Sequence, residues 1–337
     1  MKKIIIYFLV GVLLGAATIF VPRFLNESDK SVLQKCTVYI PLESSYQQML
    51  DSVATAVQNM KSFAKVADRA DLEHSFKPGR YVFTPDKSNK DLVRMLKKGW
   101  EHPMMLTLSG NIRNLEKLSG ILGRKLACDS ADFAEYFAKE EVWSTNGFEK
   151  GTFMAMFLPN TYEVYWTITP EKFVERMKKE YDKFWNNDRT AKAKEIGLSA
   201  IEVSILASIV CEETNYAPEM PRVAGVYMNR LKRGIKLDAD PTVKFALGDP
   251  TVKRILFRHL KVDSPYNTYL YAGLPPGPIT IPSVRGIDAV LNYENHNYLY
   301  FCANSNMDGT HKFARTLSEH NRNARAYQAA LNKMKIR

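Results

Sequence analysis

The sequence predicts an α+β protein in which one membrane-spanning helix precedes a small sheet-and-helix unit and a larger mixed α+β unit. Residues 4–21 carry no charge and are almost wholly apolar or small. Residues 36–108 alternate short β-rich segments with helical patterns, whereas residues 109–337 are helical in most of their patterning. The length of 337 residues exceeds one small domain and suits two packed units plus an anchor.

The apolar run at residues 4–21 predicts an uncleaved transmembrane helix. Its length lies at the lower edge of what crosses a hydrocarbon core of roughly 30 Å. A cleaved signal, the alternative, usually has an apolar core of roughly 7–15 residues before a small-residue cleavage site. Here further apolar residues follow the small cluster at residues 15–17. Lys2 and Lys3 place residues 1–3 in the cytoplasm and everything after Phe24 outside, with residues 22–35 expected as a tether.

The charge balance excludes some functions and leaves others open. The 47 Lys and Arg against 36 Asp and Glu give a formal charge of +11. These basic residues are scattered, so a nucleic-acid partner is not expected, and a basic surface facing membrane and wall accounts for them. Cys36, Cys128, Cys211 and Cys302 show no CxxC spacing and are read as buried thiols, although pairing cannot be deduced. The six histidines form no HxxxH or HExxH pair, and we expect neither a metal nor a cofactor.

Residues 36–108 are expected to fold as a small α+β unit. Residues 37–40, 81–83 and 104–108 have the content of strands, with turn chemistry at residues 77–80. Ser45 and Gln48 form a capping box that opens a helix. The apolar spacing of that helix predicts a buried stripe of Leu50, Val53, Val57 and Met60. A shorter helix is expected from residue 89 to residue 98, closed by Gly99.

The middle of the chain, residues 109–198, is expected to be mostly helical. A helix beginning near Pro170 has one apolar face, formed by Phe173, Met177, Tyr181 and Phe184. Farther along, Ser199 and Glu202 make a second capping box, and that helix reaches residues 211–214 before Pro218 prevents much continuation.

Glu213 stands out at the end of that helix. It follows Leu206, Ile209 and Val210 at helical spacing, so its carboxyl is expected against apolar side chains. Burial and the negative end of the helix dipole both raise the pKa of a carboxyl. A carboxyl that stays protonated near neutral pH can protonate a leaving oxygen. Glu212 fits the apolar face almost as well, and spacing alone does not choose between them.

The segment Ala-Ser-Ile-Val-Cys-Glu-Glu-Thr at residues 207–214 resembles the active-site helix of the endolytic murein transglycosylase family, the MltG or YceG-like proteins. Six further blocks follow in the family's order, at residues 226–231, 240–243, 266–269, 273–279, 298–301 and 318–321. Residues 36–108 resemble the family's LysM-like subdomain, and residues 159–162 resemble its Pro-Asp-Thr-Tyr loop. The resemblance implies a transmembrane helix, a LysM-like subdomain at 36–108 and a catalytic domain at 109–337 with its core at 199–325.

In this family the catalytic glutamate immediately precedes the threonine, which implies that Glu213 is catalytic. Three departures qualify the match. Asn160 stands where many members carry Asp, so it is a poor candidate for a required second acid. Asp238 stands where Gln is frequent, and we assign it no catalytic role. Cys211 replaces a charged residue but leaves Glu213 in register.

The resemblance implies a reaction that needs one glutamate. Protonated Glu213 would donate to the oxygen between N-acetylmuramic acid and N-acetylglucosamine. It would then take the proton of the muramic C6 hydroxyl, which closes a 1,6-anhydro ring. The implied partners are nascent peptidoglycan strands, the cytoplasmic membrane, peptidoglycan synthases and the division or elongation proteins.

Six residues in the matching blocks are candidates for contact with the sugars: Tyr266, Asn267, Tyr269, Asp240, Thr242 and Asn229. The tyrosines and Asn267 also suit an ordinary packed turn, and Asp240 also suits a helix cap before Pro241. The loop at residues 273–278 is expected to shape the groove, and His320 is expected to be a structural hydrogen bonder.

Two other functions remain open. A muramidase-type hydrolase would need a second carboxylate, which Glu219 or Asp240 could supply. A noncatalytic wall-binding protein would use the LysM-like unit and leave Glu213 dispensable.

Overall fold

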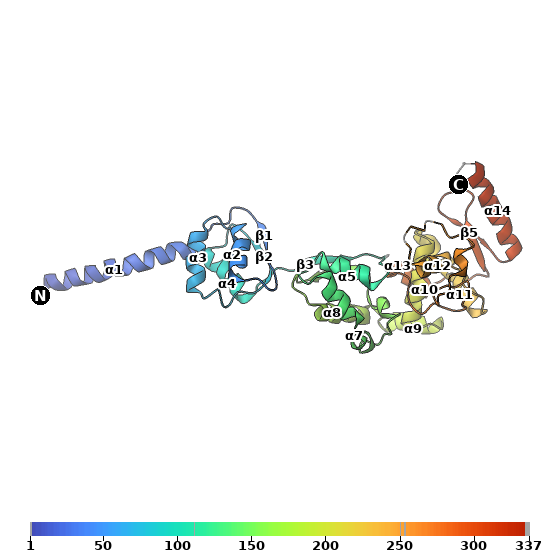
Figure 1. The fold of residues 1–337 in the computed structure, drawn as a ribbon, viewed down its shortest axis with the longest axis horizontal. Coiled ribbons are helices and arrows are strands. Elements are labelled where there is room, and N and C mark those ends of the chain that lie inside the picture. The colour runs from blue at the N-terminus through green and yellow to red at the C-terminus, as the bar shows by residue number, and fades with distance from the viewer. Residues whose placement is uncertain (1, 111, 250, 253, 334–337) are drawn as a thin grey trace. The chain divides into compact units, whose positions relative to one another are not determined.

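Figure 1 shows the protein as a computed structural model, which describes residues 2–110, 112–249, 251–252 and 254–333. The chain divides into two compact units. Unit 1 holds residues 1–106, 125–128 and 163–169, and unit 2 holds residues 107–124, 129–162 and 170–337. The described strands pair as three two-stranded sheets among many helices, which confirms the α+β class.

Helix α1 (Lys2–Ser28) is longer than the sequence suggested. We expected the helix to end before Pro22 and a tether to follow, and this was wrong for residues 22–28. Pro22 removes one backbone hydrogen bond but its ring is tolerated within the helix. Beyond it, Arg23 pairs with Glu27 one turn on, and the Asn26 amide donates to the Pro22 carbonyl. Within the described chain, Lys3–Ser28 is the one helix apolar and long enough to cross a membrane.

Unit 1 is built on an antiparallel pair of strands, β1 (Cys36–Ile40) and β2 (Gly79–Phe83), in which Cys36 lies opposite Phe83. Helices α2 (Tyr46–Ala54), α3 (Met60–Arg69) and α4 (Asn89–Lys98) complete it. Its core consists of side chains from all these elements, among them Val38, Met49, Phe63, Tyr81, Phe83 and Leu92.

The predicted buried stripe from Leu50 to Met60 does not lie on one helix. Helix α2 buries Met49 and Val53 and ends at residue 54, and α3 starts only at Met60. Asn59 caps α3 by accepting from the Ser62 amide, so the chain turns where continuous helix was expected.

The first part of unit 2 surrounds an aromatic core. Its elements include parts of the paired strands β3 (Met104–Leu108) and β4 (Asn160–Val164), together with α5 (Leu115–Gly123), α6 (Ser130–Ala138), α7 (Glu140–Ser144), η1 (Phe153–Met156), α8 (Pro170–Phe184) and α9 (Asn187–Glu195). Phe137 contacts the rings of Phe133, Phe153, Phe157 and Phe173. Helix α8 buries Phe173, Met177 and Tyr181 as its spacing predicted, whereas Phe184 on the same predicted face is only half-buried.

The remainder of unit 2 places the candidate site. Its elements are α10 (Ala200–Glu213), η2 (Ala217–Glu219), α11 (Met220–Lys232), α12 (Asp240–Leu247), η3 (His259–Lys261), α13 (Val284–Leu291), β5 (Tyr300–Ala303), β6 (His311–Ala314) and α14 (Leu317–Lys333). Helix α10 is buried from Val203 to Val210 and packs against α11, α12 and α13. Gly286 permits the close approach of α13, since a Cβ there would lie 2.2 Å from the Cys211 sulfur. The Ser199–Glu202 capping box is present. No disulfide joins the four cysteines, all of which the structure describes; Cys128 is buried as predicted, whereas Cys36, Cys211 and Cys302 are only half-buried.

Candidate active site

Glu213 is the last residue of α10, and its side chain lines a pocket of about 400 Å³. The pocket is bordered by α11, by residues 237–240, by Tyr269 and by strand β5. The Tyr227 hydroxyl of α11 donates a hydrogen bond of 2.5 Å to Glu213 Oε1. A carboxyl group therefore sits at the end of a buried helix, with one neutral donor fixing its orientation.

The surroundings of Glu213 favour its protonated form. Burial raises its pKa from the ordinary 4.5 to about 7. The Tyr227 hydrogen bond opposes this shift, whereas the carboxylates of Asp240 and Glu212 add to it. Burial also raises the pKa of Tyr227, with a further contribution from Glu213, so the phenol keeps the proton it donates. Near neutral pH Glu213 can thus both give and take a proton.

The neighbouring Glu212 lies in a different environment. Its carboxylate is paired with the Arg113 guanidinium, and it lines a separate pocket with Ser109, Thr280 and Ser283. Helical spacing did not distinguish Glu212 from Glu213 as the candidate acid, but their surroundings do. Glu212 has a cationic partner, and Glu213 has a phenol.

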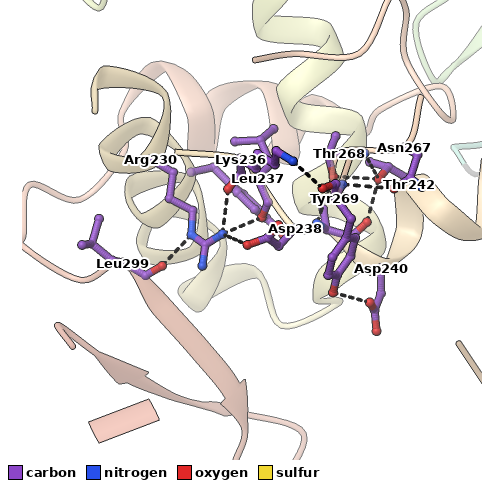
Figure 2. Close-up of polar contacts among 12 residues, drawn as sticks. Arg230, Lys236, Leu237, Asp238, Asp240, Thr242, Asn267, Thr268, Tyr269 and Leu299 are labelled. Carbon is purple, nitrogen blue, oxygen red and sulfur yellow. Dashed lines mark hydrogen bonds and ion pairs between the residues drawn. The ribbon is translucent and has the colours of Figure 1, made fainter. Parts of the chain in front are cut away.

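Arg230 holds one side of the pocket, and sequence reasoning missed it. Its Nε donates to the Leu299 carbonyl at 2.7 Å, and its Nη1 donates to the Lys236 carbonyl at 2.7 Å. Nη1 also pairs with Asp238 Oδ2 at 2.8 Å, which Figure 2 shows beside the other contacts. Asp238 has a left-handed φ of 49°, a conformation uncommon for residues other than glycine. This cluster fixes the chain just before Asp240.

A second cluster holds the same segment from the other end (Figure 2). The Ala239 amide donates to Thr268 Oγ1 at 3.0 Å, and Thr268 Oγ1 also bonds Thr242 Oγ1 at 2.8 Å. Beside it the Tyr269 hydroxyl donates to Asp240 Oδ1 at 2.7 Å. The alternative role of Asp240 as a helix cap is excluded, because Ala239 occupies the N-cap position of α12 and that position has no side-chain cap bond. Asp240 instead lines the pocket together with Tyr269.

Asn267 and Thr242 were predicted to contact sugar, but the structure gives both a structural role. Asn267 is fully buried, and its amide donates to the carbonyls of Leu260 and Val262 at 2.9 and 2.8 Å. Its oxygen accepts from the Tyr269 amide. Thr242 is also fully buried and donates to the Ala239 carbonyl at 2.7 Å. Both polar groups are saturated by the chain and position Tyr269 and Asp240.

Tyr266 and Asn229, the remaining candidates, are not among the residues that line the Glu213 pocket. The Tyr266 ring packs on Phe245 with centroids 4.7 Å apart. The Asn229 amide donates to the carbonyls of His296 and Tyr298 at 2.7 and 3.0 Å. The loop at residues 273–278 is likewise absent from this lining, and at Gly277 it packs against the backbone of Gly151.

Two further side chains bear on the alternatives. Glu219 is buried and accepts from the His311 amide at 3.0 Å and bonds the His311 ring at 2.6 Å. This contact holds the start of β6 and engages one of the two carboxylates considered as the second acid of a hydrolase. His320 lines the Glu213 pocket and stacks on Tyr300 with centroids 5.5 Å apart. Burial lowers the pKa of His320, and Arg230 lowers it further.

Tyr227 and Arg230 left a weak signal in the sequence. They are three residues apart, so they share a face of α11. Both lie in the block at residues 226–231 that carried part of the resemblance. Helical spacing could pair them, but it could not show that this face meets the end of α10.

The model of the YceG-like family matches residues 38–326. An endolytic murein transglycosylase of Bacillus subtilis (strain 168) is 38% identical over 135 residues, which cover 40% of this chain and 37% of the relative. An endolytic murein transglycosylase of Streptococcus pneumoniae (strain D39) is 26% identical over 366 residues, covering 96% of this chain and 64% of that protein. The chain thus spans less than two thirds of the length of these relatives.

A solved structure gives the same likeness in three dimensions. The crystal structure of a putative YceG-like protein from Listeria monocytogenes has a TM-score of 0.58 and 26% sequence identity. The match covers 86% of this chain and 98% of that one.

Proposed function

This chain belongs to the YceG-like family, and we propose that it is an endolytic lytic transglycosylase of peptidoglycan. The observation that carries the proposal is the Glu213 carboxyl, whose pKa is raised to about 7 at the end of a buried helix. The relatives named endolytic murein transglycosylases support the substrate class. The bond cut is the β-1,4 bond from N-acetylmuramic acid to N-acetylglucosamine, within a strand.

The first step uses protonated Glu213 as the acid. Its proton moves to the glycosidic oxygen, the bond from that oxygen to muramic C1 breaks, and N-acetylglucosamine leaves with a free 4-hydroxyl. Positive charge develops at C1 and the ring oxygen, as in other glycosidic cleavages. The Asp240 carboxylate lines the same pocket, and its charge stabilises this state.

The second step restores the enzyme. The Glu213 carboxylate takes the proton of the muramic C6 hydroxyl, and O6 bonds to C1 to close the 1,6-anhydro ring. The proton count balances and no water is consumed. A C6 hydroxyl held near C1 has a large effective concentration, which lets one glutamate suffice. The Tyr227 hydrogen bond keeps Glu213 aimed through both steps.

Tyr269 and Tyr300 supply the aromatic surface that pyranose rings favour, and both line the pocket. Of the six residues first considered for sugar contact, Tyr269 and Asp240 therefore remain. Asn267, Thr242, Tyr266 and Asn229 support the segments around them.

The location follows from α1, which we propose as a single-pass anchor with its N-terminus in the cytoplasm. Residues 36–108 then form a LysM-like unit outside the cytoplasmic membrane, followed by the catalytic domain at 109–337. An enzyme held there terminates nascent strands close to peptidoglycan synthases and to the division or elongation proteins.

The test is mass spectrometry of muropeptides released from purified peptidoglycan by the full chain in detergent, beside its Glu213→Gln variant. We expect 1,6-anhydro-muramic ends from internal positions of the strand, and none from the variant. Reducing ends would contradict the proposal and favour a hydrolase with Asp240 as second carboxylate. Strand binding without cleavage would favour a wall-binding protein.

A further inference from the structure

We propose that a basic face of unit 1, beside the end of α1, binds the headgroups of anionic phospholipids. The face consists of Arg23, Arg69, Lys90, Arg94, Lys97 and Lys98, which line one pocket of about 460 Å³. The proposal rests on the part of the proposed function that places α1 across the membrane. It does not depend on the catalytic role of Glu213.

Helix α1 is docked into unit 1 at its polar end. The Asn26 carbonyl accepts from the amide of Asn89 at 3.2 Å and from the Ser62 hydroxyl at 3.4 Å. Glu27 pairs with Lys90 at 3.1 Å. The chain then enters the core of the unit at Val32. The helix that spans the membrane therefore continues without a tether into the folded unit, and it fixes the depth of that unit.

The depth follows from helix geometry. Residues 4–21 span about 27 Å at a rise of roughly 1.5 Å per residue, close to a hydrocarbon core of about 30 Å. Arg23 lies two residues beyond this run, and Glu27 lies about 6 Å farther along the axis. The pocket that both residues line is therefore expected at the level of the phospholipid headgroups.

The charge of this face is unbalanced. Its six basic residues are accompanied by two acids, Glu27 and Asp91. Glu27 is already paired with Arg23 and Lys90. Asp91 accepts from Ser88 in the cap of α4. Among the residues that the structure describes, no carboxylate forms an ion pair with any of the other four: Arg69, Arg94, Lys97 and Lys98.

The arrangement on α4 is directional. Lys90, Arg94, Lys97 and Lys98 recur at spacings of four, seven and eight residues, so they share one face of the helix. Trp100 follows directly, about half exposed at 54%, with the Arg94 guanidinium 5.7 Å from its ring centroid. Exposed tryptophan beside basic residues is typical of a membrane–water interface. Basic side chains at this depth gain most where the lipid phosphates carry net negative charge.

The experiment measures lipid selectivity with the full chain reconstituted in phosphatidylcholine vesicles. Dansyl-labelled phosphatidylglycerol or dansyl-labelled phosphatidylcholine is added as a tracer, and energy transfer from tryptophan is compared between them. We expect the anionic tracer to associate about fivefold more strongly at low salt, and less so at high salt. The ratio between tracers cancels changes in the tryptophan emission itself.

Two variants with equal charge loss separate this face from net charge. Arg69→Gln/Arg94→Gln/Lys98→Gln should bring the tracer ratio close to one. The control Lys179→Gln/Lys183→Gln/Lys194→Gln removes three exposed lysines of α8 and α9 and should keep the ratio of the native chain. Equal transfer to both tracers in the native chain would overturn the proposal, as would equal ratios in the two variants.

The Glu213→Gln variant keeps the test independent of catalysis. It should lose cleavage and retain full lipid selectivity. Selectivity without cleavage in the native chain would contradict only the catalytic proposal. If the native chain did not float with the vesicles, the proposed membrane anchor would be refuted, and the proposed headgroup-binding face with it.

Discussion

The last two residues of α10 are both glutamates, and their carboxyl groups meet opposite surroundings. Glu212 faces the Arg113 guanidinium, with its side chain in a second pocket. Glu213 faces the Tyr227 phenol and the carboxylates of Asp240 and Glu212. One step along an α-helix turns a side chain by about 100°, and that turn moves the carboxyl from a cation to a neutral donor.

This difference decides which of the two carboxyls can serve as an acid. A guanidinium stabilises the carboxylate, whereas burial without a cation stabilises the protonated form. Position at the helix end, the dipole and the apolar stripe are nearly the same for both residues. The partner supplied by another segment of the chain makes the distinction, and substitutions can change each part of it separately.

Removal of each carboxyl in turn should give the largest contrast. Glu213→Gln keeps the shape of the side chain and the Tyr227 hydrogen bond but cannot transfer a proton. We expect kcat/KM to fall about 10³-fold, within the usual range for general acid–base groups. Glu212→Gln should stay within about threefold, because its loss affects an ion pair near the surface. The release of anhydro-muropeptides per unit time measures both, and equal losses would refute the assignment.

The same substitution should change stability in a pH-dependent way. The Glu213 pKa rises from 4.5 to about 7 on folding, so the unfolded chain releases this proton first. Below pH 4.5 the group is protonated in both states and the free energy of unfolding is unaffected. As pH rises from 4.5 to 7 the free energy of unfolding falls, and above pH 7 the loss reaches its full value of at most about 3 kcal/mol. Glu213→Gln should therefore gain stability relative to the native chain between pH 4.5 and pH 8. Denaturant unfolding in detergent measures this, and Glu212→Gln is the control.

Much of this contrast was beyond the sequence. The Ser199–Glu202 box and the apolar spacing predicted α10 and placed Glu213 at its end, because those signals are local. Tyr227 could not be found in that way, since its contact with Glu213 depends on how α11 packs on α10. Arg113, the partner of Glu212, lies almost a hundred residues earlier in the chain.

The choice of Asn267 and Thr242 as candidates for sugar contact has a related cause. Both residues belong to blocks that resemble the family, but a residue in such a block can serve to position its neighbours rather than to contact substrate. Only the fold shows that the side-chain amide of Asn267 already donates to two backbone carbonyls. The predicted end of the first helix was too early for a local reason, because proline usually ends a helix. In the structure α1 continues past Pro22, and its docked end overrides that local preference.

Neutralising Asp240 should affect Glu213 in two ways, by lowering its pKa and by removing a negative charge from the pocket. Asp240→Asn keeps an acceptor for Tyr269 but removes the charge that helps hold the Glu213 proton. The pKa of Glu213 should fall, and the alkaline limb of the kcat/KM profile should move to lower pH. Loss of charge beside the developing cation should also lower kcat about tenfold. Asp238→Asn is the matched control, because its carboxylate is paired with Arg230.

Tyr227→Phe should move the same limb in the opposite direction. The Tyr227 hydrogen bond lowers the pKa of Glu213, so its loss should raise that pKa and extend activity to higher pH. The carboxyl also loses the donor that aims it, and kcat at the optimum should fall about fivefold, the worth of one hydrogen bond of ~1 kcal/mol. Opposite displacements for Tyr227→Phe and Asp240→Asn would place both side chains in control of one proton. A common displacement would show that the limb reports another group, and the distinction between Glu213 and Glu212 would then need a different physical basis.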